Sequence, residues 1–429
     1  TLACIIGIVG GAIVWRLLKV DNQLRQDLID TAQAEVTALR IGNFANYMDI
    51  QRSASDAFIF EQEQAYANYQ LLKQAGRIQL TGDVLDVEID ENRGRVILRE
   101  IIDGIPYKVM WFYWFYEEGG SSNQIGWRRV PDDLTFWGNE REIETDRVQV
   151  DYRTLDSLFA ETLAKQIESW ITAGCAELDC VTLPPQMTIK VVAERPARIA
   201  WSSADYWTLI VTSPYVERAR ADVAIAPERE AEIAREIAGR LLALRLNYGT
   251  LPQNSDAVWL YDDFARWLGN ALRDEPQLGF MESLIALYGA NAPQAVLTAL
   301  PTASTLDSAV TVMLGAPLSA LPVEQIAALD WRSYFQWRLD LESRILMQPG
   351  TGNLLDLYDL NDIYAAGEAA RRQEDAAYAA LPAPQVQRVD ITRDAESQTY
   401  AYVEVIQPDA GTTSTIIWRL TDGTWKRRS

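Results

Sequence analysis

The apolar positions between residues 228 and 246 recur at steps of three and four, which is the period of an amphipathic α-helix. They are Ile233, Ile237, Leu241 and Leu244. Pro227 stands before the first turn, where a missing backbone N–H costs nothing. The pattern therefore predicts one long helix that turns an apolar face to a core.

The first 20 residues are apolar up to Arg16 and predict a single transmembrane anchor over residues 1–20. A charge in the middle of a bilayer costs roughly 2.5–3.5 kcal/mol, so Arg16 and Lys19 should lie at the membrane boundary. A span needs about 20 apolar residues, and because the sequence does not begin with Met we expect upstream residues to complete it. A signal peptide and a lipidated Cys4 are the alternatives. No small-residue cleavage site follows the run, however, and apolar residues follow Cys4.

Residues 21–150 show a helical pattern and then an alternating one. Apolar and aromatic residues recur at helical spacing up to Gly76, where the helical region should end. Alternating segments bounded by turn residues predict strands. These are expected at 84–90, 95–101, 107–116 and 127–130. Helices followed by a curved antiparallel sheet predict a cone-shaped α+β domain over residues 21–150.

The third of these predicted strands carries six consecutive aromatic residues. They are Trp111, Phe112, Tyr113, Trp114, Phe115 and Tyr116. Successive side chains of a strand point to opposite faces, so the odd-numbered members face one side and the even-numbered members the other. Only one set can lie in the core of the cone. The other must cover a neighbouring domain or a partner, which makes this strand a candidate interaction surface.

The remaining chain divides into a mixed segment at 151–329 and a final one at 330–429. The mixed segment predicts a helix, two strands, the long helix described above and then short helices separated by prolines. The final segment predicts two helices and then four strands, of which the last is Trp425-Lys426-Arg427. Trp127-Arg128-Arg129 holds the same place after the first set of strands. The matching order predicts a second cone-shaped domain over residues 330–429.

Composition places the chain among globular proteins. It has 429 residues, of which 48% are hydrophobic and 23% charged, and that length predicts several domains. The 39 Lys and Arg residues are outnumbered by 60 Asp and Glu residues, for a formal net charge of −21. This balance argues against binding to nucleic acid through a broad electrostatic surface.

The chain contains three cysteines and no histidine. Histidine is the commonest general base near neutral pH and the commonest zinc ligand, so its absence removes both roles. Cys175 and Cys180 are five residues apart between a predicted helix and a predicted strand. We predict a disulfide between them, which implies an oxidising compartment and contributes roughly 2 kcal/mol. The alternative is a pair of free, partly buried thiols.

Two segments carry a resemblance to a peptidase family. The long helix contains Arg235-Glu236-Ile237-Ala238-Gly239, at the place of a zinc-binding His-Glu-x-x-His, and Trp259-Leu260-Tyr261-Asp262-Asp263-Phe264-Ala265 follows it. The second segment has the spacing of Trp-Leu-x-Glu-Gly-x-Ala, which supplies a third ligand. Together they resemble the gluzincin-type, peptidase MA-like family. The resemblance implies a site without its metal ligands, with Arg235, Glu236, Gly239 and Asp262 at the degenerate positions.

A second resemblance covers roughly residues 25–150. It is carried by Ala38-Leu39-Arg40-Ile41-Gly42, the aromatic strand, Gly126-Trp127-Arg128-Arg129 and the segments 131–133 and 136–138. This region resembles the nuclear-transport-factor-two-like fold of membrane-anchored bacterial extracytoplasmic proteins. The resemblance implies a sheet curled round a pocket that holds a ligand, catalyses a reaction or is filled by side chains.

Little catalytic chemistry remains in these residues. Glu236 without a metal has no activated water, because bulk water has a pKa near 15.7 and only metal binding lowers it to about 7. We expect Glu236 to pair with Arg240, one helical turn further on. One alternative is that Glu236, Asp262 and Asp263 hold a hard cation through oxygen atoms. Another is a metal-independent hydrolase that uses two carboxylates.

These observations predict an α+β multidomain pseudo-enzyme with no catalytic residues, metal ligands or cofactor. We expect a membrane-anchored interaction or scaffold protein whose body lies outside the cytoplasm, as the predicted disulfide indicates, and which serves as an accessory subunit of a larger membrane or cell-surface assembly. Its expected partners are the membrane and either another protein or further copies of the chain. The alternative is an extracytoplasmic sensor that binds a small ligand in a cone pocket.

Overall fold

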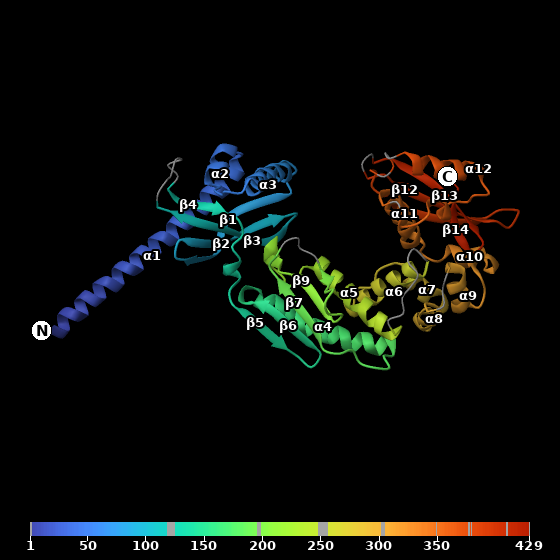
Figure 1. Cartoon of the computed structure of the whole chain (residues 1–429), viewed down its shortest axis with the longest axis horizontal. Helices are drawn as coiled ribbons and strands as arrows, with labels where there is room; N and C mark the ends of the chain where they lie inside the picture. Colours follow the sequence, from blue (N-terminus) through green and yellow to red (C-terminus); the bar gives the residue numbers. More distant parts are fainter. Residues whose placement is uncertain are drawn as a thin grey trace. The chain divides into compact units, whose positions relative to one another are not determined.

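The computed structural model describes the backbone of residues 2–117, 125–194, 199–247, 256–301, 305–348, 350–375, 378, 380–408 and 411–428 (Figure 1). Side chains are described from Asp21 onward within these ranges. The chain divides into two compact units, residues 1–168 with 185–230 and residues 169–184 with 231–429. Both units combine helices with sheets, so the expectation of an α+β multidomain protein is confirmed.

The first unit begins with three helices and an antiparallel sheet. The helices are α1 (Leu2–Ile41), α2 (Phe44–Ile50) and α3 (Asp56–Gln74). The strands are β1 (Ile78–Asp90), β2 (Arg93–Ile102), β3 (Ile105–Tyr116) and β4 (Gly126–Val130). Strands β1 to β3 form a meander, and β3 also pairs with β4 and with the short strand β10 (Ala219–Arg220).

The helical stretch predicted for residues 21–76 is divided into these three helices. Gly42 ends α1 with a φ of +77°, a left-handed conformation that suits glycine. Asn43 and Ser55 then cap α2 and α3 by accepting hydrogen bonds from backbone N–H groups of the first turns. The two breaks let the helices fold back on the sheet.

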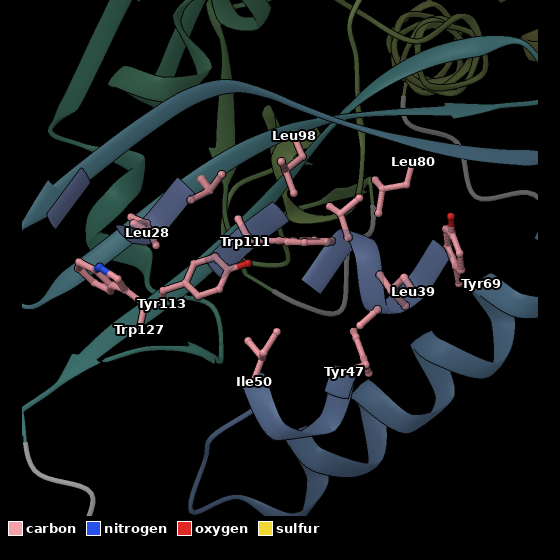
Figure 2. Packing of buried hydrophobic residues seen from close by; sticks show 14 of the residues in the cluster. Leu28, Leu39, Tyr47, Ile50, Tyr69, Leu80, Leu98, Trp111, Tyr113 and Trp127 are labelled. Atoms are coloured by element: carbon pink, nitrogen blue, oxygen red, sulfur yellow. The ribbon is translucent and has the colours of Figure 1, made fainter. Parts of the chain in front are cut away.

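The core of this region lies between the helices and one face of the sheet. Figure 2 shows Trp111 and Tyr113 on the side of the sheet that faces Tyr47 and Ile50. Leu28 of α1 packs at Gly94 of β2, where a Cβ atom would lie 2.6 Å from the leucine side chain. A side chain at position 94 would therefore require the side chain of Leu28 to shift.

A second, mixed sheet completes the first unit. Its strands in spatial order are β5 (Glu140–Glu144), β6 (Val148–Arg153), β7 (Met187–Val192), β9 (Thr208–Thr212) and β8 (Ala200–Trp201). Strands β6, β7 and β9 are parallel, and α4 (Ser157–Leu178) connects β6 to β7. Sequence analysis found β7 and β9 but missed β5 and β6. Strand β5 reads Glu-Arg-Glu-Ile-Glu and is mostly exposed at the edge of the sheet, so its residues carry little apolar signal.

The second unit begins with a run of helices. They are α5 (Pro227–Arg245, within this unit from Ala231), α6 (Asp256–Leu272), α7 (Phe280–Tyr288), α8 (Ala292–Ala299), α9 (Leu306–Leu314) and α10 (Val323–Ala327). The long helix predicted at 228–246 is confirmed to within one residue at each end. The short helices expected between the prolines are confirmed as well.

The same unit ends with helices and a four-stranded antiparallel meander. These elements are α11 (Arg332–Met347), the 3₁₀ turn η6 (Leu354–Leu357), α12 (Ile363–Glu374), β11 (Gln385–Arg393), β12 (Thr399–Ile406), β13 (Thr413–Thr421) and β14 (Thr424–Arg427). Their order repeats that of α1 to α3 and β1 to β4. Residues 330–429 belong to the same compact unit as residues 231–329. The division into four domains remains a prediction.

The predicted anchor at residues 1–20 lies outside the residues whose side chains are described. Among the residues whose side chains the structure describes, no helix combines the length and apolar character needed to cross a membrane.

Candidate functional site

Helices α5 and α6 carry the four positions of the predicted degenerate site. They cross almost in backbone contact, because a Cβ atom built on Gly269 would lie 3.0 Å from Cα of Arg235. The hydroxyl of Tyr261 on α6 donates a hydrogen bond of 2.5 Å to the carbonyl oxygen of Gly239 on α5. The apolar face of α5 is buried around this crossing. The two helices therefore hold their side chains in one defined register.

Arg235 lies close enough to Asp262 to affect the pKa of its carboxyl group. Burial raises the pKa of Asp262, and the guanidinium groups of Arg235, Arg266 and Arg344 oppose this rise. Glu236 is half-buried on the same helix as Arg235. The structure thus brings together two of the positions that correspond to metal ligands in the predicted family, and it fills them with a cation and an acid.

Asp263, the next residue, has a structural role in joining helices. It is 3% exposed and accepts hydrogen bonds from the hydroxyl of Ser333 at 3.0 Å and the backbone N–H of Met281 at 3.3 Å. Arg266 lies 3.3 Å from the same carboxylate. These partners use the oxygen atoms of Asp263 to join α6 to α7 and α11.

The donor set at this crossing does not suit a transition metal. A guanidinium cannot act as a ligand, since it has donors and no acceptor, and Gly239 offers no side chain. Within the described ranges, no three His, Cys, Asp or Glu side chains are grouped closely enough to hold a metal ion. Glu236, Asp262 and Asp263 therefore do not form the oxygen-ligand cluster considered as an alternative.

The aromatic strand β3 alternates as the sequence predicts. Trp111 and Tyr113 are buried in the core against the helices, with Phe115 packed beside them. Phe112 points to the other face and belongs to a second apolar cluster with Phe136 and Trp137, its ring lying 5.7 Å from that of Trp137. At Phe112 this second face is covered by residues of the same chain. The expectation that the strand forms an interaction surface remains a prediction.

Only part of the predicted interaction surface is therefore accessible. Trp114 is 42% exposed, whereas Trp111, Phe112 and Tyr113 are buried. The guanidinium of Arg52 lies 3.6 Å from the ring centroid of Tyr116 and shields that ring. An interface on this strand would centre on Trp114.

A buried carboxylate that the sequence pattern did not predict lies between the helices and the sheet of the first unit. Glu35 of α1 is fully buried and accepts hydrogen bonds from the hydroxyl of Tyr113 at 2.8 Å and the amide of Gln51 at 3.1 Å. Arg129 of β4 is 3.3 Å away, with its guanidinium 4.6 Å from the ring centroid of Trp111. Burial raises the pKa of Glu35, and Arg129 and the two hydrogen bonds oppose this rise.

The helices of residues 330–429, together with the last strand of the meander, form the same arrangement. Glu342 of α11 is 3% exposed, lies 2.8 Å from Arg427 of β14 and 2.9 Å from Arg372 of α12, and accepts a hydrogen bond of 2.8 Å from the hydroxyl of Tyr358. Tyr358 stands 16 residues after Glu342, as Gln51 stands 16 residues after Glu35.

The backbone around the two clusters also matches. Gln51 forms a parallel bridge with Arg129, and Tyr358 forms one with Arg427. Each arginine follows a buried tryptophan by two positions, as the matching Trp-basic-basic segments in the sequence indicated. The sequence signal for the acids was present too, since each lies among apolar residues at helical spacing, where a charge needs a partner.

A polar network fixes the second sheet of the first unit. The hydroxyl of Ser213 donates a hydrogen bond of 2.7 Å to Asp156 and accepts one of 3.0 Å from the indole N–H of Trp137. Burial raises the pKa of Asp156 to about 6. The network anchors Trp137, which in turn covers Phe112.

Cys175 and Cys180 are both free thiols in this structure. The predicted disulfide between them remains a prediction.

No protein-family model matches this sequence, and no curated protein matches it either.

Proposed function

We propose that this chain is a non-catalytic, membrane-anchored interaction or scaffold protein with its body on the extracytoplasmic side. In this proposal residues 151–329 are a degenerate gluzincin-like domain, and the flanking regions are cone domains of the nuclear-transport-factor-two-like type. The protein serves as an accessory subunit of a larger membrane or cell-surface assembly.

One observation carries the proposal. The crossing of α5 and α6 brings the cation of Arg235 within electrostatic range of Asp262, and these two positions correspond to metal ligands in the family that the sequence resembles. The charge of a guanidinium can neutralise a half-buried carboxylate much as a metal ion would, but it supplies no activated water. This supports a scaffold that keeps the packing of a peptidase without its chemistry.

A restored site tests the resemblance. We expect the triple variant Arg235→His, Gly239→His, Asp262→Glu to bind one zinc ion, because two imidazoles four residues apart share one helix face. A Cβ atom on Gly239 would have ordinary contacts of 3.9 Å with Ala265 and Tyr261, so a side chain fits there. The matched control places the second histidine at Arg240 instead. Equal zinc content in the two purified triple variants, or none in the first, would remove the support for a peptidase-like site.

A pull-down tests the interaction role. Trp114 is the exposed aromatic of β3, and Tyr364 is a still more exposed aromatic in the second unit, at 83%. We expect chain purified from detergent-solubilised membranes to bring down a stoichiometric protein partner or a defined oligomer. Trp114→Glu should lower that recovery at least about tenfold, as loss of an aromatic hot spot does, while Tyr364→Glu should leave it unchanged. A monomer without any partner would contradict the proposal.

The second candidate is a sensor that binds a small ligand inside the first cone. Among the described residues, Oε1 of Gln51 and Nε of Arg129 are buried and have no hydrogen-bond partner. Two such atoms favour a site for a polar ligand. The aromatic rings around Glu35 support the opposite interpretation, because Arg129 already occupies them as an internal cation. A thermal-shift screen with small amines and acids separates the two. A ligand that stabilises the natural chain but not the Gln51→Leu variant would support the sensor function.

A further inference from the structure

Helix α4 ends in a backbone motif that brings two particular side chains together. Asp179 follows the helix with a φ of +49°, a left-handed conformation that Asp tolerates. The N–H of Cys180 then donates a hydrogen bond of 3.1 Å to the carbonyl oxygen of Cys175. A bond that spans six residues across a left-handed residue identifies the Schellman motif.

In this motif the residue after the left-handed position packs against the residue five places earlier, usually through apolar side chains. Both positions are cysteines here, so the backbone hydrogen bond of the motif sets the two side chains on the same side of the helix end. The contact is thus a product of the helix end itself. It does not depend on a distant part of the chain.

The surroundings hold the two sulfur atoms in place. Cys175 is 7% exposed and Cys180 is half-buried. Nε of Arg245, in the last turn of α5, donates a hydrogen bond of 2.9 Å to the carbonyl oxygen of Leu178 and fixes the end of α4. Burial raises the pKa of the Cys180 thiol to about 12, so little thiolate exists at neutral pH once the chain has folded. Exchange chemistry at this pair should therefore take place during folding.

We propose that Cys175 and Cys180 form a structural disulfide that closes the C-terminal cap of α4. The oxidant is a donor disulfide, either glutathione disulfide or an oxidoreductase. One cysteine thiolate attacks the donor and releases its first thiol, and the second cysteine then attacks the mixed disulfide and releases the other. Two electrons pass to the donor, which leaves as two thiols carrying the two protons. The proposal does not depend on the scaffold function.

The test measures how strongly the fold favours this bond. The full chain carries Cys4→Ser, so that only the pair can cross-link. It is unfolded in urea with or without reductant, then refolded into glutathione buffers of graded ratio, so that equilibrium is reached from both directions. Alkylation and mass spectrometry then give the fraction of disulfide, and a parallel titration is made in urea. We expect the effective concentration of the two thiols to be at least about tenfold higher in the folded chain.

A shifted pair serves as the matched control. Cys175→Ala with Ala176→Cys moves one thiol to the exposed side of the helix and keeps almost the same loop length. We expect no folded-state advantage for this pair. The proposal is overturned if the native pair shows no advantage over the chain in urea, or if the shifted pair shows the same advantage. Loss of the protein partner proposed above would leave this equilibrium unchanged, so the two proposals fail separately.

Discussion

At the scale of single residues, the buried carboxylates show how this fold accommodates charge in its interior. A buried charge is tolerated only when partners replace its hydration, and each of these acids has a different set of partners. Glu342 faces two arginines at 2.8 and 2.9 Å, whereas Glu35 faces one at 3.3 Å and relies on an amide and a phenol for the rest. The two clusters have the same geometry, but Glu342 has two positive charges beside it and Glu35 has one.

Neutralising the two acids should therefore have unequal effects. Glu342→Gln leaves Arg372 and Arg427 without their shared anion, and we expect it to cost about 3 kcal/mol or more of stability. Glu35→Gln leaves only Arg129 without an anion and removes a carboxylate that burial already disfavours, so its cost should be smaller, about 1 kcal/mol. Urea unfolding followed by tryptophan fluorescence measures both. An equal or reversed order would contradict the assignment of partners.

Asp156 should make the stability of the first unit dependent on pH. Its pKa rises from 3.8 to about 6 in the folded chain. Between these values the unfolded chain has released the proton and the folded chain has kept it, so stability falls as pH rises and levels off above pH 6.

The variant Asp156→Asn should not show this fall, because an amide does not titrate in this range. Its oxygen atom can still accept the hydrogen bond from Ser213. Relative to the variant, the natural chain should lose on the order of 2 kcal/mol between about pH 4 and pH 7. Urea unfolding of both chains across this range measures the difference. Parallel stability curves would show that Asp156 titrates as an ordinary exposed carboxyl.

At the scale of elements, the α5–α6 crossing depends on the absence of one side chain. A Cβ atom on Gly269 would lie 3.0 Å from both Cα and N of Arg235, which are backbone atoms that cannot move independently. Gly239 lies at the same crossing but has open contacts of 3.9 Å. The two glycines form a matched pair.

We expect Gly269→Ala to cost about 2 kcal/mol or more, because the helices must separate. Gly239→Ala should be neutral or stabilise the chain by up to about 1 kcal/mol, since alanine is the better helix former. Thermal unfolding monitored by circular dichroism compares the two. A cost for Gly239→Ala that matched the first would place the close contact elsewhere on α5.

Helices and strands with a periodic apolar pattern were predicted well. Elements that form because of their neighbours in the fold were predicted less well. Helix α5 was placed to within one residue because its apolar face repeats over five turns. Strand β5 was missed because an edge strand with alternating charges buries little. The breaks at Gly42 and Asn43 could have been found from their capping chemistry, but the aromatic residues on either side continued the helical spacing.

At the scale of the whole molecule, the helical run of the second unit packs against α11, the first helix after residue 330. The ring of Trp259 lies 4.9 Å from that of Tyr334, and the ring of Phe280 lies 5.3 Å from that of Trp331. Asp256 accepts a hydrogen bond of 3.0 Å from the hydroxyl of Tyr334. These contacts cross residue 330, where sequence analysis expected one domain to end.

Removal of residues 330–429 should therefore unfold the rest of this unit. The shortened chain exposes Trp259 and Phe280 and leaves the buried carboxylates of Asp256 and Asp263 without Tyr334 and Ser333. We expect residues 231–329 to become sensitive to limited proteolysis, while residues 21–168 stay resistant. Resistance of residues 231–329 equal to that in the full chain would support a domain boundary at residue 330.

Of the candidate site, sequence reasoning identified α5, α6 and the positions Arg235 and Asp262, because motif spacing is local. It did not identify Glu35, Glu342 or Asp156, whose importance comes from burial. The aromatic strand was predicted in part. The alternation of its residues predicted two faces, but it did not predict that Phe136 and Trp137 would cover one of them.

The sequence by itself determined the periodic helices and strands, the order of elements repeated at the two ends and the lack of imidazole ligands, because spacing and composition do not depend on contacts. Only the tertiary structure decided which carboxylates are buried beside which arginines, since those partners come from segments up to 118 residues apart. The stability of a charge depends on everything that surrounds it, and a linear pattern does not contain that information.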